Sequence, residues 1–314
     1  MENYLPYKEE IDSRIARDIE RYRKEFINML GFPLNQYIND PTSVSREFVG
    51  SDDVCNIYRL KIDVARGLNF CGLYMVPHNE ARPAPLVIVA HGALGTPELM
   101  YGMHGKNGYS SLILRILRRG ARVFAPQLLL WNKGQSPQKP KYSTDYDRQK
   151  LDSRLKSLGG SMTALEVFCM MRATDCLQSH PESEFSSLGF AGMSYGAYLG
   201  LYMMASDTRI ACAYLCGCFN ERLRYRFPEW HYQNDANTFL DAEIAALCSP
   251  RALYIEVGEK DDIFDFRTAQ SEAIRAKRYY TSAGAEENFR FSIWNGAHLV
   301  NPADDGLDFL FANM

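Results

Sequence analysis

Short apolar runs alternate along the chain with longer segments in which apolar residues recur every three or four positions. Runs without polar alternation are typical of strands covered on both faces, as in a parallel sheet. Strands that alternate with helices predict βαβ units, so we expect an α/β fold with a mostly parallel central sheet and helices on both faces. The predicted strands are Leu86–Ala90, Val123–Ala125, Leu188–Ala191, Ala213–Cys216, Ala252–Val257 and Phe289–Ile293. The predicted helices are Ser110–Arg119, Met162–His180, Tyr195–Ser206 and Thr268–Ser282.

The first part of the chain has a different pattern. Glu9–Leu30 carries apolar residues at the spacing of one helix face, with charged residues on the other. Glu47–Val76 predicts two antiparallel strands, the first of which alternates with period two. We therefore expect a single α/β domain over residues 1–314, in which residues 1–40 form an N-terminal helical extension and antiparallel strands follow.

Two stretches do not fit the alternation of strands and helices. Residues 131–160 are polar and charged, which predicts either a lid inserted over a site or a surface loop. The second stretch, Asn220–Thr238, contains Phe227, Trp230, His231 and Tyr232. Aromatic rings from both stretches would suit the flat face of a sugar, and the alternative is that they fill the core beneath an irregular loop. The candidate substrate-binding residues are Trp131, Trp230 and His231.

The composition is typical of a soluble globular protein, with 46% hydrophobic and 23% charged residues among 314. The formal net charge is −3 with no basic block, so no nucleic-acid partner is expected. No apolar run approaches the ~20 residues that span a bilayer, and Met1–Pro6 has no signal-peptide pattern. We therefore expect a cytoplasmic protein with no membrane partner.

The eight cysteines lie mostly inside apolar runs, where a free thiol packs as a small hydrophobe. Cys212, Cys216 and Cys218 lie close together, but they lack Cys-x-x-Cys spacing and a nearby histidine. The surrounding segment Ala211–Phe219 is instead typical of a buried strand. We predict no metal site and a reducing compartment.

The candidate nucleophile is Ser194, at the centre of Gly192-Met193-Ser194-Tyr195-Gly196. The motif follows a predicted strand and begins a predicted helix, so it resembles the nucleophile elbow of the α/β-hydrolase fold. Such a tight turn strains the backbone of the serine and brings residues two positions away into contact. Glycine at positions 192 and 196 removes the Cβ atoms that would collide.

A serine hydroxyl needs a base to accept its proton and a carboxylate to orient that base. In α/β hydrolases these partners follow in the order Ser, Asp, His. Asp261 comes just after the predicted strand that ends at Val257, and His298 lies on the loop that precedes the last helix. We favour Asp261 as the acid because it lies three residues after Gly258 at the strand end, where this fold usually places its acid. Asp262 and Asp265 are the alternatives.

A tetrahedral intermediate needs two backbone N–H donors. One is expected from Tyr195, directly after the nucleophile. The other is expected from the loop His91-Gly92-Ala93-Leu94-Gly95, where we assign it to Ala93 with Leu94 as the second choice. His91 is interpreted as a structural hydrogen-bonding residue rather than as a second base.

The chain resembles the dienelactone hydrolase and acetyl xylan esterase-like branch of the α/β hydrolases, from about Glu47 to the C-terminus. The motifs that carry the resemblance are His91-Gly92, Gly192-x-Ser194-x-Gly196, Asp207-Thr208-Arg209-Ile210, Leu247-Cys248-Ser249-Pro250-Arg251, Gly258-x-x-Asp261-x-x-Phe264 and His298. The resemblance implies a serine hydrolase that cleaves small acyl esters, such as acetyl esters of carbohydrates, through a Ser–His–Asp acyl-enzyme mechanism. It also implies that no cofactor is needed and that a homo-oligomer can form.

Two other functions stay open at this point. The first is a peptidase related to the prolyl oligopeptidases, which share the elbow and the order of the triad. Those enzymes carry a β-propeller before the catalytic domain, and the 85 residues before Leu86 are too few for one. The second is a non-catalytic relative that binds a ligand; such proteins commonly lose a triad residue, whereas this chain keeps all three.

Overall fold

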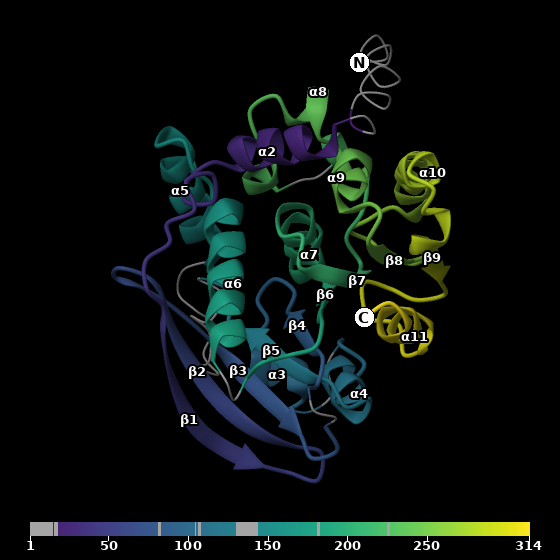
Figure 1. Cartoon of the computed structure of the whole chain (residues 1–314). Helices are drawn as coiled ribbons and strands as arrows, with labels where there is room; N and C mark the ends of the chain where they lie inside the picture. The colour runs from purple at the N-terminus through teal and green to yellow at the C-terminus, as the bar shows by residue number, and fades with distance from the viewer. Residues whose placement is uncertain are drawn as a thin grey trace.

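A mixed sheet of nine strands runs through the described part of the chain (Figure 1). The computed structural model describes Ile15 and residues 18–80, 83–103, 105, 108–129, 144–180, 183–224 and 227–314. The strands are β1 (Ser43–Ser51), β2 (Cys55–Ala65), β3 (Leu68–Pro77), β4 (Leu86–Ala90), β5 (Arg122–Pro126), β6 (Leu188–Met193), β7 (Ile210–Cys216), β8 (Ala252–Gly258) and β9 (Phe289–Trp294). Their spatial order is β1-β2-β3-β5-β4-β6-β7-β8-β9.

The sheet changes from antiparallel to parallel at β5. The pairs β1–β2, β2–β3 and β3–β5 are antiparallel, and every pair from β5 to β9 is parallel. From β4 the chain first adds β5 on one side and then β6 on the other. The neighbouring strands β4 and β6 therefore flank a topological switch point, where loops diverge and leave a crevice at the carboxyl ends of the strands.

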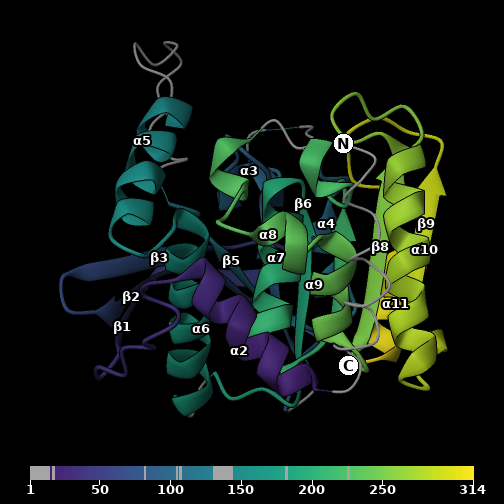
Figure 2. The same ribbon diagram turned by 90° about the horizontal axis from the view of Figure 1, so that it is seen from above.

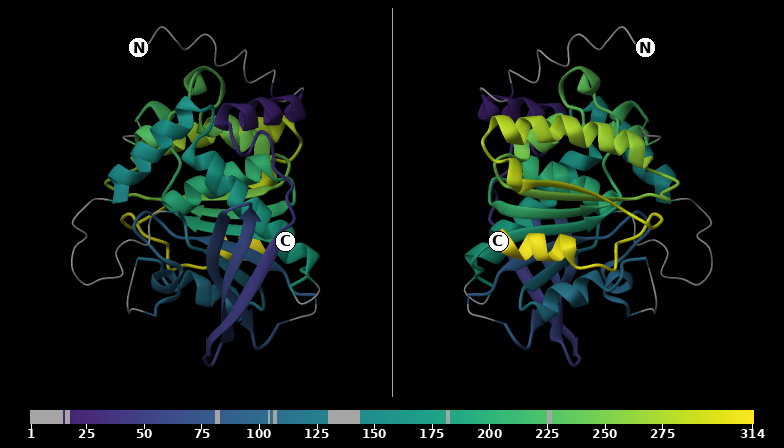
Figure 3. Two further views of the ribbon diagram at one scale, coloured as in Figure 1. Left: turned by 90° about the vertical axis from the view of Figure 1, so that its left-hand side faces the viewer. Right: turned by 90° about the vertical axis from the view of Figure 1, so that its right-hand side faces the viewer.

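Helices cover both faces of the sheet (Figures 1 and 2). One face packs against α2 (Ile19–Leu30), α6 (Met162–Ser179), α7 (Tyr195–Ser206), α9 (Asp241–Cys248) and α10 (Phe266–Ser282). The other face packs against α3 (Pro97–Tyr101), α4 (Leu112–Arg118) and α11 (Asp305–Ala312). Figure 3 shows α10 and α11 on opposite sides of the strands. The remaining helices are α5 (Thr144–Ser157), which packs on α6, and the short α8 (Asp235–Thr238), η2 (Arg222–Arg224), η3 (Pro228–Trp230) and η4 (Glu286–Asn288).

The central strand β4 shows why unbroken apolar runs predicted this architecture. All of its residues are buried. Leu86, Ile88 and Ala90 belong to one hydrophobic core, and Val87 and Val89 belong to the core on the opposite face. Because successive side chains of a strand point to opposite faces, a strand between two helical layers must be apolar at every position. The predicted α/β fold is confirmed.

Two predicted segments need correction. The stretch Glu47–Val76 was predicted to form two antiparallel strands, and it contains parts of three, β1, β2 and β3. Strand β1 has no buried residue, so it lacks the apolar alternation that marks a half-buried strand. The irregular stretch 131–160 contains helix α5, in which Arg148 and Asp152 are the buried residues that are described. Since charged residues occupy its inner face, α5 shows no apolar periodicity.

The predicted N-terminal helix is described from Ile19 onward as α2, and its earlier residues, apart from Ile15, lie outside the described part of the chain. Among the helices that the structure describes, none combines the length and the apolar character that a bilayer span requires.

Candidate active site

Ser194 occupies the turn between β6 and α7. Its backbone has φ 55° and ψ −119°, and its N–H donates to the carbonyl of Cys216 at the end of β7 (2.8 Å). A Cβ atom at position 192 would lie 2.6 Å from the carbonyl oxygen of Gly196, and one at position 196 would overlap the carbonyl of Ala90. Both glycines are therefore required by close backbone approach, as the motif predicted.

The structure brings Ser194, His298 and Asp261 together in one hydrogen-bonded series. The Nε2 atom of His298 lies 2.8 Å from the Oγ atom of Ser194, and its Nδ1 atom lies 2.7 Å from Oδ2 of Asp261. Because a carboxylate can only accept, Nδ1 carries the ring proton and donates it to Asp261. The Nε2 atom is then the acceptor of the serine hydroxyl, which is the arrangement a general base needs.

The geometry separates Asp261 from its two alternatives. The side chain of Asp261 has no exposed surface, and its Oδ1 atom accepts the N–H groups of Ile263 (2.8 Å) and Phe264 (3.0 Å). Asp262 is exposed, and the side chain of Asp265 caps α10 by accepting the N–H of Arg267 (2.9 Å). Only Asp261 among these three carboxylates contacts His298.

Two residues to which the sequence assigned no role in the site, the motif residue Phe264 and Gly217, pack against the imidazole. The ring of Phe264 stacks on that of His298, with 5.5 Å between the centroids. Gly217 has φ 63°, and a Cβ atom there would lie 3.2 Å from the imidazole Cε1. A side chain at position 217 would therefore press on the ring that has to face Ser194.

The loop that carries His298 is anchored by two hydrogen bonds. The side chain of Asn301 donates to the buried Glu256 on β8 (3.0 Å), and the N–H of Val300 donates to the carbonyl of Gly108 (2.9 Å). Burial raises the pKa of Glu256, against the lowering effect of its hydrogen bonds from Asn301 and Tyr214. These contacts fix the direction from which the imidazole reaches the serine.

The loop after β4 passes close beside the nucleophile. A Cβ atom at Gly92 would lie 3.3 Å from the Cβ of Ser194. The N–H of Gly92 donates to the hydroxyl of Tyr109 (3.0 Å), and that of Gly95 donates to the carbonyl of Gly92 (3.0 Å). The candidate oxyanion donors of this loop are then the N–H groups of Ala93 and Leu94, the two that the sequence indicated.

The second candidate donor is the N–H of Tyr195, the first residue of α7. Backbone N–H groups in the first turn of a helix point along the axis at its positive end. An oxygen that becomes negative beside Ser194 would therefore face both the helix end and the loop after β4.

His91 is a structural residue, as its position in the sequence indicated. It is fully buried, and its Nε2 atom accepts the N–H of Leu128 (3.1 Å). Its Nδ1 atom therefore carries the proton and donates it to the carbonyl of Gly92 (2.7 Å). Burial lowers the pKa of His91 to about 4, so the ring is neutral at physiological pH.

The three predicted substrate-binding residues differ in where the structure places them. Trp131 lies outside the described part of the chain. Trp230 is only 2% exposed and stacks on Tyr198 with 4.2 Å between ring centroids, so its assignment to substrate is corrected to the core. Its ring also packs on Phe264, and it thereby supports the residue that stacks on His298. His231 is partly exposed near Asp235 (3.9 Å).

Tyr232, one of the aromatic residues predicted to suit the face of a sugar, also belongs to the core. Its hydroxyl bonds to Thr163 and Tyr198 at 2.6 and 2.7 Å. Within the described residues, no three His, Cys, Asp or Glu side chains converge as metal ligands would.

Comparison with known proteins agrees with the fold. No protein-family model matches the chain, and no curated protein matches it in sequence. A solved structure of a protein assigned as an acetyl xylan esterase from Bacteroides fragilis is similar to the chain with a TM-score of 0.69 and 14% identity, over 91% of this chain and 76% of that one. A glucuronoyl esterase from Solibacter usitatus has a TM-score of 0.66 and 15% identity, over 93% and 92%. One from Teredinibacter turnerae has a TM-score of 0.61 and 15% identity, over 94% and 84%.

The neighbouring carboxylates Asp261 and Asp262 provide a matched pair of substitutions. Asp261→Asn should lower kcat about 10⁴-fold, because an amide that faces Nδ1 favours the wrong tautomer of His298. Asp262→Asn should lower kcat less than about threefold, because that side chain is exposed and away from the imidazole. Steady-state kinetics on one ester decide the matter, and the opposite ranking would move the acid to Asp262.

The buried imidazole of His91 predicts an acid-dependent stability. An unfolded histidine takes up a proton near pH ~6.5, whereas the folded ring does so near pH 4. The unfolded state therefore binds more protons between these values, so the free energy of unfolding should fall as the pH is lowered from about 6.5 to 4. This contribution is on the order of 3 kcal/mol. Urea unfolding at several pH values should show a smaller pH dependence for His91→Gln than for the wild type. Equal slopes in the two proteins would contradict the assignment.

Proposed function

We propose that this chain is a serine hydrolase that cleaves carboxylic esters, specifically small acyl esters such as acetyl esters of carbohydrates. The observation that carries the proposal is the hydrogen-bonded series Ser194–His298–Asp261 on a strained strand-to-helix turn. A serine in that backbone conformation is costly to the fold, and such outliers cluster at functional sites.

The proposed reaction proceeds through an acyl-enzyme. The Oγ atom of Ser194 attacks the acyl carbon while Nε2 of His298 takes the hydroxyl proton, and Asp261 stabilises the resulting imidazolium. The carbonyl oxygen becomes negative and accepts from the N–H groups of Tyr195 and Ala93. Collapse of the intermediate expels the alcohol, which takes the proton from His298. Water then attacks the acyl group by the same steps in reverse order and releases the acid and the free serine.

The choice of esters is supported by the solved structures that share the fold. They are a protein assigned as an acetyl xylan esterase and two glucuronoyl esterases. The motifs from His91-Gly92 to His298 resemble the dienelactone hydrolase and acetyl xylan esterase-like branch of the α/β hydrolases. The acetyl xylan esterase assignment and the motifs support a small acyl group, so small acyl esters of carbohydrates are the substrates we propose, without a cofactor.

The state of the cysteines supports a cytoplasmic location. All eight are free thiols, and seven of them are buried. Burial raises the pKa of several of them, including Cys169 and Cys212, and thereby keeps these thiols protonated and unreactive. A chain with this many unpaired cysteines fits a reducing compartment.

Removal of the nucleophile tests the mechanism. Ser194→Ala should lower kcat by about 10⁴- to 10⁶-fold and abolish covalent labelling by a fluorophosphonate. Ser206→Ala, at the other end of α7, removes a buried hydroxyl that bonds to the carbonyl of Tyr202 and should leave labelling and turnover intact. A wild-type protein that is neither labelled nor active on any ester would indicate a ligand-binding relative instead of an enzyme.

The acyl group can be tested independently of the nucleophile. p-Nitrophenyl acetate should be hydrolysed with a kcat/KM at least ~10-fold higher than the octanoate ester, equivalent to ~1.4 kcal/mol, because the site is proposed to fit a small acyl group. Acetate, butyrate and octanoate are compared side by side on wild-type protein. A preference that rises with chain length would contradict the proposal of small acyl esters and favour a lipase-like acyl tunnel.

A further inference from the structure

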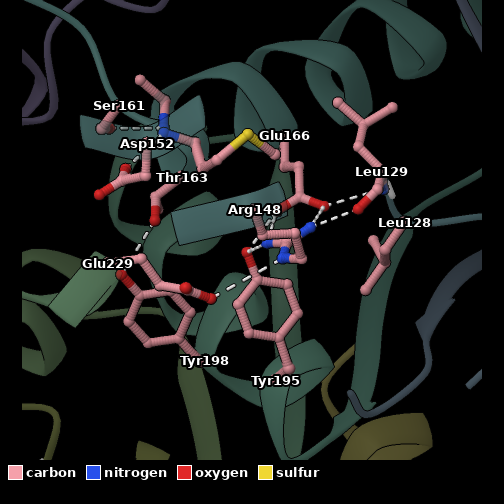
Figure 4. Close-up of polar contacts among 12 residues, drawn as sticks. Leu128, Leu129, Arg148, Asp152, Ser161, Thr163, Glu166, Tyr195, Tyr198 and Glu229 are labelled. Carbon is pink, nitrogen blue, oxygen red and sulfur yellow. Dashed lines mark hydrogen bonds and ion pairs between the residues drawn. The ribbon is translucent and has the colours of Figure 1, made fainter. Parts of the chain in front are cut away.

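A fully buried ion pair contacts the side chain of Tyr195, the residue that follows Ser194 (Figure 4). Arg148 on α5 and Glu166 on α6 both have side chains with no exposed surface. The guanidinium contacts both carboxylate oxygens, with Nη1–Oε1 and Nη2–Oε2 distances of 3.2 and 3.0 Å. Removing two charges from water costs about as much as their attraction returns, so such pairs are weak evidence for stability. Stability alone therefore does not explain why these two charges are buried at this place.

The pair holds the side chain of Tyr195, the residue whose N–H is the proposed oxyanion donor. The tyrosine hydroxyl donates to Oε2 of Glu166 and accepts from Nη2 of Arg148. The guanidinium also lies 4.6 Å from the centroid of the tyrosine ring. Burial raises the pKa of Tyr195 well above its ordinary value, so the hydroxyl keeps the proton that it donates. The first residue of α7 is thus fixed at both its backbone and the tip of its side chain.

The same pair holds the segment that follows β5. The N–H of Leu129 donates to Oε1 of Glu166 (2.9 Å), and its carbonyl accepts from Nη1 of Arg148. The preceding N–H, of Leu128, donates to His91, which donates in turn to the carbonyl of Gly92. The bonds from Tyr195 through Glu166, residues 128–129 and His91 therefore lead to the loop that carries Ala93.

We propose that Arg148 and Glu166 are positioning residues that set the distance between the two donors of the oxyanion hole. They act through Tyr195 on one side and through residues 128–129 and His91 on the other. Oxyanion stabilisation depends on donors that are aligned before the reaction, and small displacements weaken it. The inference rests on the proposed serine-hydrolase function and adds two residues to its machinery.

The chain contains a matched cluster that serves as a control. Arg222 and Asp241 form a second buried ion pair, and Arg222 donates to the hydroxyl of Tyr202, which also lies on α7. Tyr202 is two helical turns beyond Tyr195 and does not adjoin the nucleophile. Both clusters are thus buried arginine–carboxylate pairs in which the guanidinium contacts a tyrosine hydroxyl of α7, and only the first contacts the residue after Ser194.

The first comparison removes one hydroxyl oxygen from each cluster. Tyr195→Phe should lower kcat for p-nitrophenyl acetate about tenfold with KM unchanged, because a misaligned donor weakens binding of the transition state only. Tyr202→Phe should change kcat less than twofold. The affinity for phenylboronic acid, which forms a tetrahedral adduct on a serine, should fall by the same factor as kcat/KM in Tyr195→Phe.

The second comparison separates positioning from stability. Arg148→Met leaves Glu166 as a buried unpaired charge, so it should lower the Tm as well as kcat. The double variant Arg148→Met/Glu166→Leu removes both charges of the pair, but the nearly buried Glu229, whose Oε1 lies 3.7 Å from Nε of Arg148, then loses that contact. A triple variant that adds Glu229→Gln removes this charge as well, and its Tm should return close to that of the wild type. Its kcat should remain about 100-fold low, a loss near that of one oxyanion donor.

Three results would overturn the inference. They are a folded triple variant with wild-type kcat, a Tyr195→Phe variant with wild-type kcat, or equal losses in Tyr195→Phe and Tyr202→Phe. Tyr195→Phe keeps the test decisive if the triple variant does not fold. A wild-type protein that neither hydrolyses esters nor reacts with a fluorophosphonate would contradict the proposed function itself, and this inference with it.

Discussion

The strained backbone of Ser194 is the constraint on which the rest of the site depends. A non-glycine residue in this conformation costs on the order of 1–3 kcal/mol and persists only where its surroundings over-determine it. Here the turn is held by its hydrogen bond to Cys216, by two glycines that allow close backbone contact, and by α7, all of whose residues are buried. In this conformation the serine hydroxyl lies within hydrogen-bond distance of His298, and α7 begins at the next residue.

The other catalytic candidates are brought to the serine by the parallel sheet. His298 is 104 residues from Ser194 and 37 from Asp261, yet each follows a strand of the same parallel set. Carboxyl ends of parallel strands share one edge, so loops from β6, β8 and β9 meet there. The imidazole is then fixed by contacts that belong to neither catalytic partner, through Phe264, Gly217 and the anchor from Asn301 to Glu256.

Buried charge is the second feature of this fold. Arg148–Glu166 and Arg222–Asp241 both lie on the helical face of the sheet that contains α7, and each binds a tyrosine of that helix. The lower dielectric of the interior makes such contacts directional and intolerant of a missing partner. Arg148–Glu166 joins α5 to α6 and α7, and Arg222–Asp241 joins η2 to α9 and α7.

The sequence by itself determined the features that depend on near neighbours. The strand that ends in Gly192-Met193-Ser194-Tyr195-Gly196 and the helix after it needed only local pattern and backbone sterics. The apolar runs of the central strands predicted a sheet covered on both faces, because burial on both sides leaves no polar position. The order of Ser194, Asp261 and His298 followed from where each lies relative to a strand end.

Tertiary structure decided whatever depends on a distant partner. Asp261 and Asp262 differ in sequence by one position, and only the fold turns one toward His298 and the other to solvent. Trp230 was expected to bind substrate because it is an aromatic residue in an irregular segment. In the fold it packs on Tyr198 and belongs to the core. From the sequence, Arg148 and Glu166 are expected on the surface, because charged side chains are usually exposed to solvent. The packing of α5, α6 and α7 brings Arg148, Glu166 and Tyr195 into contact, and these contacts offset the cost of burying the two charges. No local sequence pattern predicts such contacts.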